Sequence, residues 1–174
     1  ESGGPELAEA LEVEGYARAV AADLVASAVT AGAVDATTGL ADPFPMTVLA
    51  ELLGLDMAGV DVDDLLGWAF DGTELLAGTN SLARMAELQA RAADAGLFLA
   101  GQLAAATPDP ETGILGAVAA GVRDGLFTPE EAIGTLVILL GAGGESTSSL
   151  VGSAIRVLAA DPALQDALRA DLGL

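Results

Sequence analysis

Three features of the sequence predict an all-α protein. Apolar residues recur at helical spacing in almost every segment, and no segment alternates apolar and polar residues as a strand does. Helix-start signals precede several of these segments, the strongest being Thr128-Pro129-Glu130-Glu131. No breaker then interrupts the chain before Asp161-Pro162. One long central helix is therefore expected over about residues 129–160, near 45 Å in length.

The same signals place the remaining helices around this central one. Pro45 suits the first turn of a helix, and glycine or proline clusters separate the other segments. The other helices are expected over residues 5–31, 46–53, 61–76, 82–106, 112–122 and 162–171. The chain has 174 residues, which is enough to bury a core in one domain, so residues 1–174 are predicted to form a single helical domain.

The composition narrows the chemistry that the chain can perform. It has no cysteine, histidine or lysine, which excludes thiolate ligands, a Ser-His-Asp triad, a P-loop and Schiff-base catalysis. It has 26 acidic residues against six arginines, a net charge of −20, which disfavours binding to nucleic acids or anionic membranes. Carboxylates, hydroxyls and a few arginines remain, and no metal site is expected.

Two observations indicate a cytoplasmic protein that does not enter a membrane. No segment reaches the 18 or more apolar residues of a membrane span. The first residues include Glu1, Glu6 and Glu9, whereas a signal peptide begins with basic residues.

The middle of the predicted central helix is unusual, because three glycines and four hydroxyl residues flank Glu145. Its sequence is Gly141-Ala142-Gly143-Gly144-Glu145-Ser146-Thr147-Ser148-Ser149. Each glycine costs a helix interior roughly 1 kcal/mol relative to alanine. Two explanations stay open: the small residues give a ligand access to the helix, or they permit close packing of another helix. A dinucleotide-binding loop is disfavoured, because its last glycine would fall on Ser146.

Several motifs in this sequence resemble those of cytochromes P450. The stretch Ala142-Gly143-Gly144-Glu145-Ser146-Thr147 is similar to the A-G-x-[DE]-T-T signature of that family's central helix I. Residues 42–54, with the sequence DPFPMTVLAELLG, resemble its helix E, and residues 125–131 resemble its entry to helix I. The resemblance covers essentially the whole chain, in the order of the family's helices D to J. It implies a helical bundle like the distal half of a P450.

Other family motifs do not appear in these residues. The sequence lacks the cysteine loop that supplies the haem ligand and the Glu-x-x-Arg pair of helix K. It also lacks the Trp-x-x-x-Arg of helix C, since Gly72 stands four residues after Trp68. The resemblance maps the family's acid to Glu145 and its oxygen-activating threonine to Ser146. Without a ligand for iron, monooxygenation is not carried over, and we expect no haem or other cofactor.

The expected function is a haem-free, non-redox acid/base step of bacterial specialised metabolism on an apolar small molecule. Cyclisation, isomerisation, epoxide opening and dehydration all suit a carboxyl group in an apolar cavity. Glu145 and Ser146 are the predicted catalytic residues. The predicted substrate-binding residues are Gly141, Ala142, Thr147, Ser148, Ser149, Trp68 and Phe70.

Two alternatives stay open beside the enzyme. The chain also resembles the P450-like auxiliary proteins that lack the haem cysteine and activate a biosynthetic partner such as a glycosyltransferase. It is also consistent with a fragment of a full-length P450 monooxygenase. Whether it is a haem-free enzyme or an auxiliary protein, a chain with only the distal half of a P450 would expose apolar helix faces. Such faces predict a homodimer or another protein partner.

Overall fold

A computed structural model describes the backbone of residues 5–171 and the side chains of residues 12–171. Within these ranges it contains no strand, and the all-α prediction is confirmed. The α-helices are α1 (Pro5–Ala31), α2 (Pro43–Leu53), α3 (Val62–Ala77), α4 (Leu82–Ala105), α5 (Ile114–Arg123), α6 (Pro129–Ala160) and α7 (Pro162–Ala170). A π-helical turn (Thr37–Ala41) precedes α2, and a 3-10 turn (Pro110–Thr112) precedes α5.

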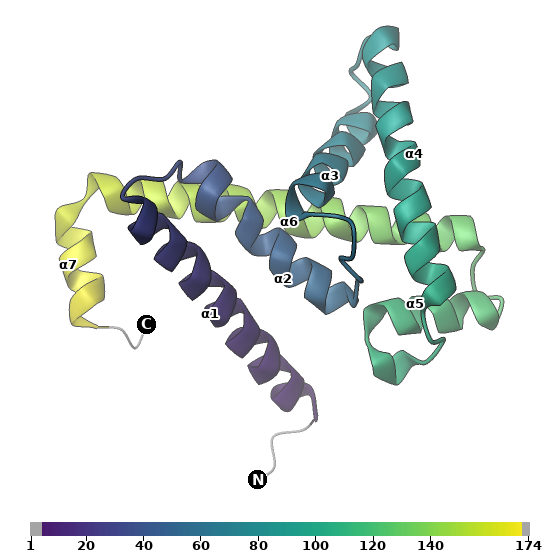
Figure 1. Cartoon of the computed structure of the whole chain (residues 1–174), viewed down its shortest axis with the longest axis horizontal. Helices are drawn as coiled ribbons and strands as arrows, with labels where there is room; N and C mark the ends of the chain where they lie inside the picture. Colours follow the sequence, from purple (N-terminus) through teal and green to yellow (C-terminus); the bar gives the residue numbers. More distant parts are fainter. Residues whose placement is uncertain (1–4, 172–174) are drawn as a thin grey trace.

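Helix α6 is the axis of the molecule and runs across its full width (Figure 1). Its predicted bounds, 129–160, are confirmed. The hydroxyl of Thr128 accepts from the N–H of Glu131, and the Glu131 carboxylate accepts from the N–H of Thr128, as in a capping box. Helices α2 and α3 pack directly on α6, and α4 packs beside α3.

The predicted start of the second helix at residue 46 is wrong, because α2 begins at Pro43. Both Pro43 and Pro45 fall in the first turn, where backbone N–H groups have no partner within the helix, so neither proline interrupts it. The π-helical turn before α2 was not predicted. It is stabilised by Asp35, whose carboxylate accepts from the N–H groups of Thr37 and Thr38. The other helix ends lie within two residues of their predicted positions.

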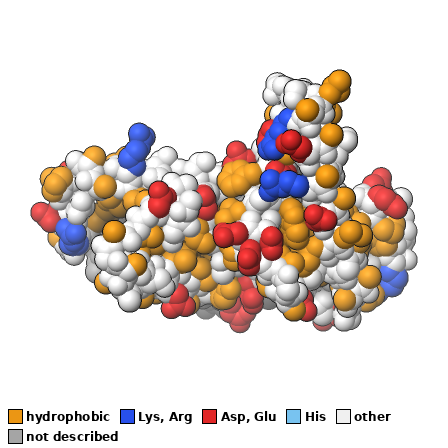
Figure 2. Space-filling model, turned by 45° about the horizontal axis from the view of Figure 1, so that its top comes forward, with side chains coloured by type: hydrophobic (Ala, Val, Ile, Leu, Met, Phe, Trp, Pro, Cys, Tyr) orange, Lys and Arg blue, Asp and Glu red, His pale blue; other side chains and the backbone are white. Residues whose placement is uncertain are grey.

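The core lies where α2, α3, α4 and α6 meet, and leucines dominate it. Its fully buried large side chains include Met46, Leu65, Leu99, Leu136 and Leu140. The solvent-accessible surface is 10701 Å², whereas a compact monomer of 17.1 kDa is expected to expose about 7800 Å². Hydrophobic side chains stay exposed among the acidic ones on the face drawn in Figure 2. None of the described helices has the length and hydropathy needed to cross a bilayer.

Candidate functional site

The glycines of α6 are positions of close helix contact. A Cβ on Gly141 would lie 3.3 Å from the Thr73 hydroxyl of α3, and a Cβ on Gly144 would overlap the Met46 sulfur of α2. Side chains of these two helices therefore pack closely against the α6 backbone at both glycines. The sequence left two explanations for the glycine cluster, and close packing is one of them. It explains the glycine at position 144, and it explains the contact between Gly141 and α3.

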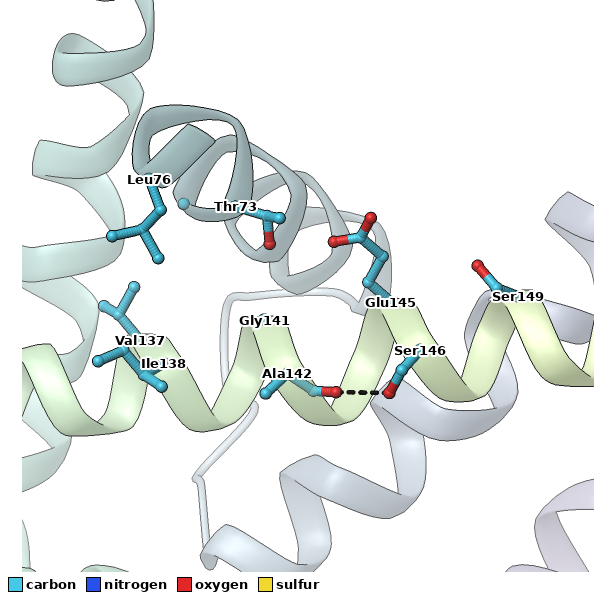
Figure 3. Close-up of a pocket in the computed structure, with 10 residues that line it drawn as sticks. Thr73, Leu76, Val137, Ile138, Gly141, Ala142, Glu145, Ser146 and Ser149 are labelled. Atoms are coloured by element: carbon cyan, nitrogen blue, oxygen red, sulfur yellow. Dashed lines mark hydrogen bonds between the residues drawn. The ribbon is translucent and has the colours of Figure 1, made fainter. Parts of the chain in front are cut away.

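The other side of this segment lines a cavity of about 380 Å³ between α3 and α6. Its wall is mostly apolar, and it opens to solvent. The lining residues are Gly72, Thr73, Leu76, Val137, Ile138, Gly141, Ala142, Glu145, Ser146 and Ser149. In Figure 3 the side chain of Glu145 rises from α6 toward α3, and Ser149 projects from the same side of α6 one turn later.

Glu145 is the single titratable side chain that lines this cavity. It is half-buried, and it has no hydrogen bond or ion pair within the part of the chain that the structure describes. Its neighbours are occupied: the Thr73 hydroxyl donates to the carbonyl oxygen of Ala69 at 3.1 Å, and the Ser146 hydroxyl donates to that of Ala142 at 2.7 Å. Both hydroxyls retain lone pairs that can accept from a ligand. A carboxylate without a partner beside an apolar cavity is available to exchange a proton with a bound molecule.

The structure separates the other predicted site residues. Gly141, Ala142 and Ser149 join Glu145 and Ser146 at the cavity.

Four predicted residues lie elsewhere. Ser148 is buried and donates a short hydrogen bond to the Asp42 carboxylate, and Thr147 does not line the cavity. Trp68 stacks at a tilt on Phe98, with ring centroids 5.3 Å apart, and lines an adjacent cavity between α3, α4 and α6. Phe70 lines a further cavity near the start of α2. Adjacent serines thus have different roles, because successive residues of a helix face about 100° apart.

Thr73 and Leu76 of α3 line the cavity and were missed at the level of sequence. Figure 3 shows Leu76 opposite Val137 at one end of the cavity and Thr73 facing the helix near Glu145. No local signal singles them out, since the pairing of α3 with α6 joins segments about 70 residues apart. Among the described residues, no cluster of three His, Cys, Asp or Glu side chains could hold a metal ion.

Comparison with known proteins finds cytochrome P450 relatives. The chain is 31% identical over 140 residues, 80% of its length, to proteins named Cytochrome P450 144 from two strains of Mycobacterium tuberculosis. Over this length the chain is a homologue of cytochromes P450. It is also 30% identical over 164 residues to the cyclomarin C epoxidase CymV of Salinispora arenicola. It spans 32% of the length of the first P450 relatives and 40% of CymV. No family model matches the chain.

Solved structures share the fold of this chain. The chain superposes on SgvP, a proposed thioether synthase in the tailoring of griseoviridin, with a TM-score of 0.78 and 31% identity. This match covers 93% of the chain and 40% of SgvP. A second match, to GfsF, has a TM-score of 0.59 and 23% identity and shows the fold only.

This chain offers no cysteine or histidine as an axial ligand for the haem typical of P450s. Met46 reaches α6 but is fully buried, with its sulfur packed on Gly144. Tyr16, the one tyrosine, lies on α1 beside Glu51 of α2. These residues do not fit as axial ligands of a haem iron.

Proposed function

We propose that the chain binds an apolar small molecule of specialised metabolism and that Glu145 moves a proton on it in a non-redox step. The observation that carries the proposal is the unpaired Glu145 carboxylate on the mostly apolar cavity between α3 and α6. The naming of CymV as an epoxidase of cyclomarin C, and of SgvP for a tailoring step, supports a substrate from natural-product biosynthesis.

Each part of the cavity has a role in this proposal. The apolar wall formed by Leu76, Val137 and Ile138 removes the substrate's hydrocarbon surface from water. Glu145 takes a proton from one atom of the bound molecule and returns it to another, as cyclisation, isomerisation, epoxide opening and dehydration all require. The lone pairs of the Ser146 hydroxyl accept a hydrogen bond from the substrate and orient it, because the hydroxyl proton already bonds to Ala142. No cofactor enters this step.

The test uses the intermediate that accumulates when the gene for this chain is deleted from its host. We expect Glu145→Gln to lower kcat on this intermediate by about 10²–10⁴-fold, because the amide cannot exchange the proton. Ser146→Ala should lower kcat less, since the hydroxyl orients the substrate. Glu130→Gln is the matched control, because Glu130 is an exposed acid in the first turn of α6 and lies outside the cavity. Circular dichroism verifies that each variant is folded.

Full kcat in the Glu145→Gln variant would contradict the acid/base step. A second candidate, an auxiliary protein that binds and activates a biosynthetic enzyme, then becomes the better function. The excess of exposed surface favours this candidate, because Leu150 and Val157 stay exposed on one side of α6 and offer an apolar docking face.

A further inference from the structure

Arg156 differs from every other arginine of this acidic chain. Five arginines have a carboxylate within ion-pair distance, namely Arg18, Arg84, Arg91, Arg123 and Arg169. Arg156 has no hydrogen bond or ion pair within the residues that the structure describes. Since the chain carries 26 acids against six arginines, an unpaired guanidinium is the exception in this molecule.

Arg156 is exposed and lines a solvent-open cavity of about 440 Å³ that is distinct from the cavity of Glu145. Four hydroxyl residues, Thr37, Ser148, Ser149 and Ser153, line it with Arg156, and Phe70 supplies an aromatic wall. The Ser148 hydroxyl already donates to Asp42. Guanidinium and hydroxyl groups are the donors that bind a carboxylate, and the phenyl ring suits the hydrocarbon next to it.

The two cavities adjoin along one side of α6. Ser149 lines both of them. Glu145, Ser149, Gly152 and Arg156 follow one another at intervals of four, three and four residues, so they lie on one stripe of the helix. Glu145 and Arg156 are separated along the axis by about 16 Å. One elongated molecule of that length can occupy both cavities.

We propose that the Arg156 cavity binds the carboxylate end of the substrate while the apolar body extends toward Glu145. This inference rests on the proposed function, because it takes the Glu145 cavity as the place of the reacting end. The substrate class is an amphipathic carboxylic acid, and a hydrocarbon part of about twelve carbons spans the whole distance to Glu145. A shorter acid such as decanoate occupies the Arg156 cavity and part of this path. The chain's negative charge repels anions in general, so a local cation is needed to hold one.

Asp42 also lines the Arg156 cavity and sets the position of the carboxylate within it. Its carboxylate accepts the Ser148 hydroxyl at the floor of the cavity. Because like charges repel, the ligand's carboxylate binds at the Arg156 end, away from Asp42. The substitution Asp42→Asn would keep an oxygen for Ser148 and remove the repelling charge.

The experiment titrates the full chain with decanoate and, as a neutral probe of equal length, with 1-decanol, by calorimetry at a pH where decanoate is ionised. We expect the wild type to bind decanoate about three- to tenfold more tightly than decanol. Arg156→Gln should abolish this preference, and Arg156→Lys should retain part of it. The matched control is Arg169→Gln, since Arg169 is paired with Asp166 and lies outside both cavities. Asp42→Asn should raise the affinity for decanoate about twofold.

Each contrary result overturns the proposal. These results are undetectable decanoate binding, equal affinity for decanol, a preference that survives in Arg156→Gln, or weaker decanoate binding by Asp42→Asn. Because calorimetry measures binding without turnover, its outcome is independent of the acid/base step. A preference for decanoate that depends on Arg156, together with full kcat in Glu145→Gln, would contradict the proposed proton transfer alone.

Discussion

Helix α3 has two faces that hold carboxylates in different ways. Toward α4, Asp71 is buried and its side chain is only 6% exposed, with Arg91 Nε 2.7 Å from Oδ2 and Arg84 Nη2 3.9 Å from Oδ1. Toward α6, the α3 wall of the cavity faces Glu145, which is half-buried and has no partner among the described residues. One carboxylate is used to join two helices, and the other is left free beside a cavity.

Asp71 and Glu145 differ in whether arginines surround the carboxylate, and this distinguishes an acid with a structural role from one available for chemistry. Asp71 and Arg91 form a close ion pair, although the Arg91 N–H is not aligned with Asp71 Oδ2 as in a good hydrogen bond. Gly67 makes room for this arginine, because a Cβ there would lie 2.9 Å from Arg91 Nη2. Glu74 extends the cluster with two bonds to Arg84, at 2.9 and 2.6 Å. Among the described residues, no arginine forms an ion pair with Glu145.

A matched pair of carboxylate-to-carboxamide substitutions tests this contrast most strongly. Asp71→Asn should lower the free energy of unfolding by about 1–3 kcal/mol, because it removes the anion between two arginines that remain half-exposed. Glu145→Gln should change it by less than about 0.5 kcal/mol, because no partner is lost. Urea denaturation of both variants measures the two values. Equal losses would mean that the two acids do not differ in structural role.

A second pair compares neighbouring serines on α6. Ser148→Ala should lower the free energy of unfolding by about 1–2 kcal/mol, since the Asp42 carboxylate loses a buried donor. Ser146→Ala should be neutral within about 0.5 kcal/mol, because the exposed hydroxyl bonds only to a carbonyl of its own helix. Thermal denaturation followed by circular dichroism separates the two. A larger loss for Ser146→Ala would refute this assignment of roles.

The smallest expected effect concerns acid pH and the α3–α4 cluster. The hydrogen bond from Arg84 holds the pKa of Glu74 below its ordinary value. A lowered folded-state pKa stabilises the protein above the ordinary value of the carboxyl, and this stabilisation disappears as the pH falls through the lowered one. Wild type should therefore be slightly more stable than Glu74→Gln at neutral pH and equal to it in acid. Urea midpoints across this range measure the difference, and a gap that persists in acid would exclude the Glu74 charge as its source.

Local signals in the sequence were sufficient to predict the helices. The capping boxes at Asp61 and Thr128 and the cap at Asp161 act between residues three positions apart, so they can be recognised without knowing the fold. The bounds of α6 and the candidate roles of Glu145 and Ser146 follow from such short-range information and from the resemblance to P450s. The exception was the start of α2, where Asp35 and the π-helical turn direct the chain into Pro43.

Tertiary packing decided which side of each helix has which role. Nothing in the run of serines distinguishes Ser148, which bonds to Asp42 106 positions away, from Ser149, which lines both cavities. Likewise, the pairing of Asp71 with Arg91, and the isolation of Arg156, depend on how α3, α4 and α6 cross. Helix formation depends on neighbours within one turn, whereas helix crossing depends on side chains from distant segments that fit together only after the helices pack. The sequence thus predicts the elements and the position of Glu145, and the fold determines the cavity that it faces.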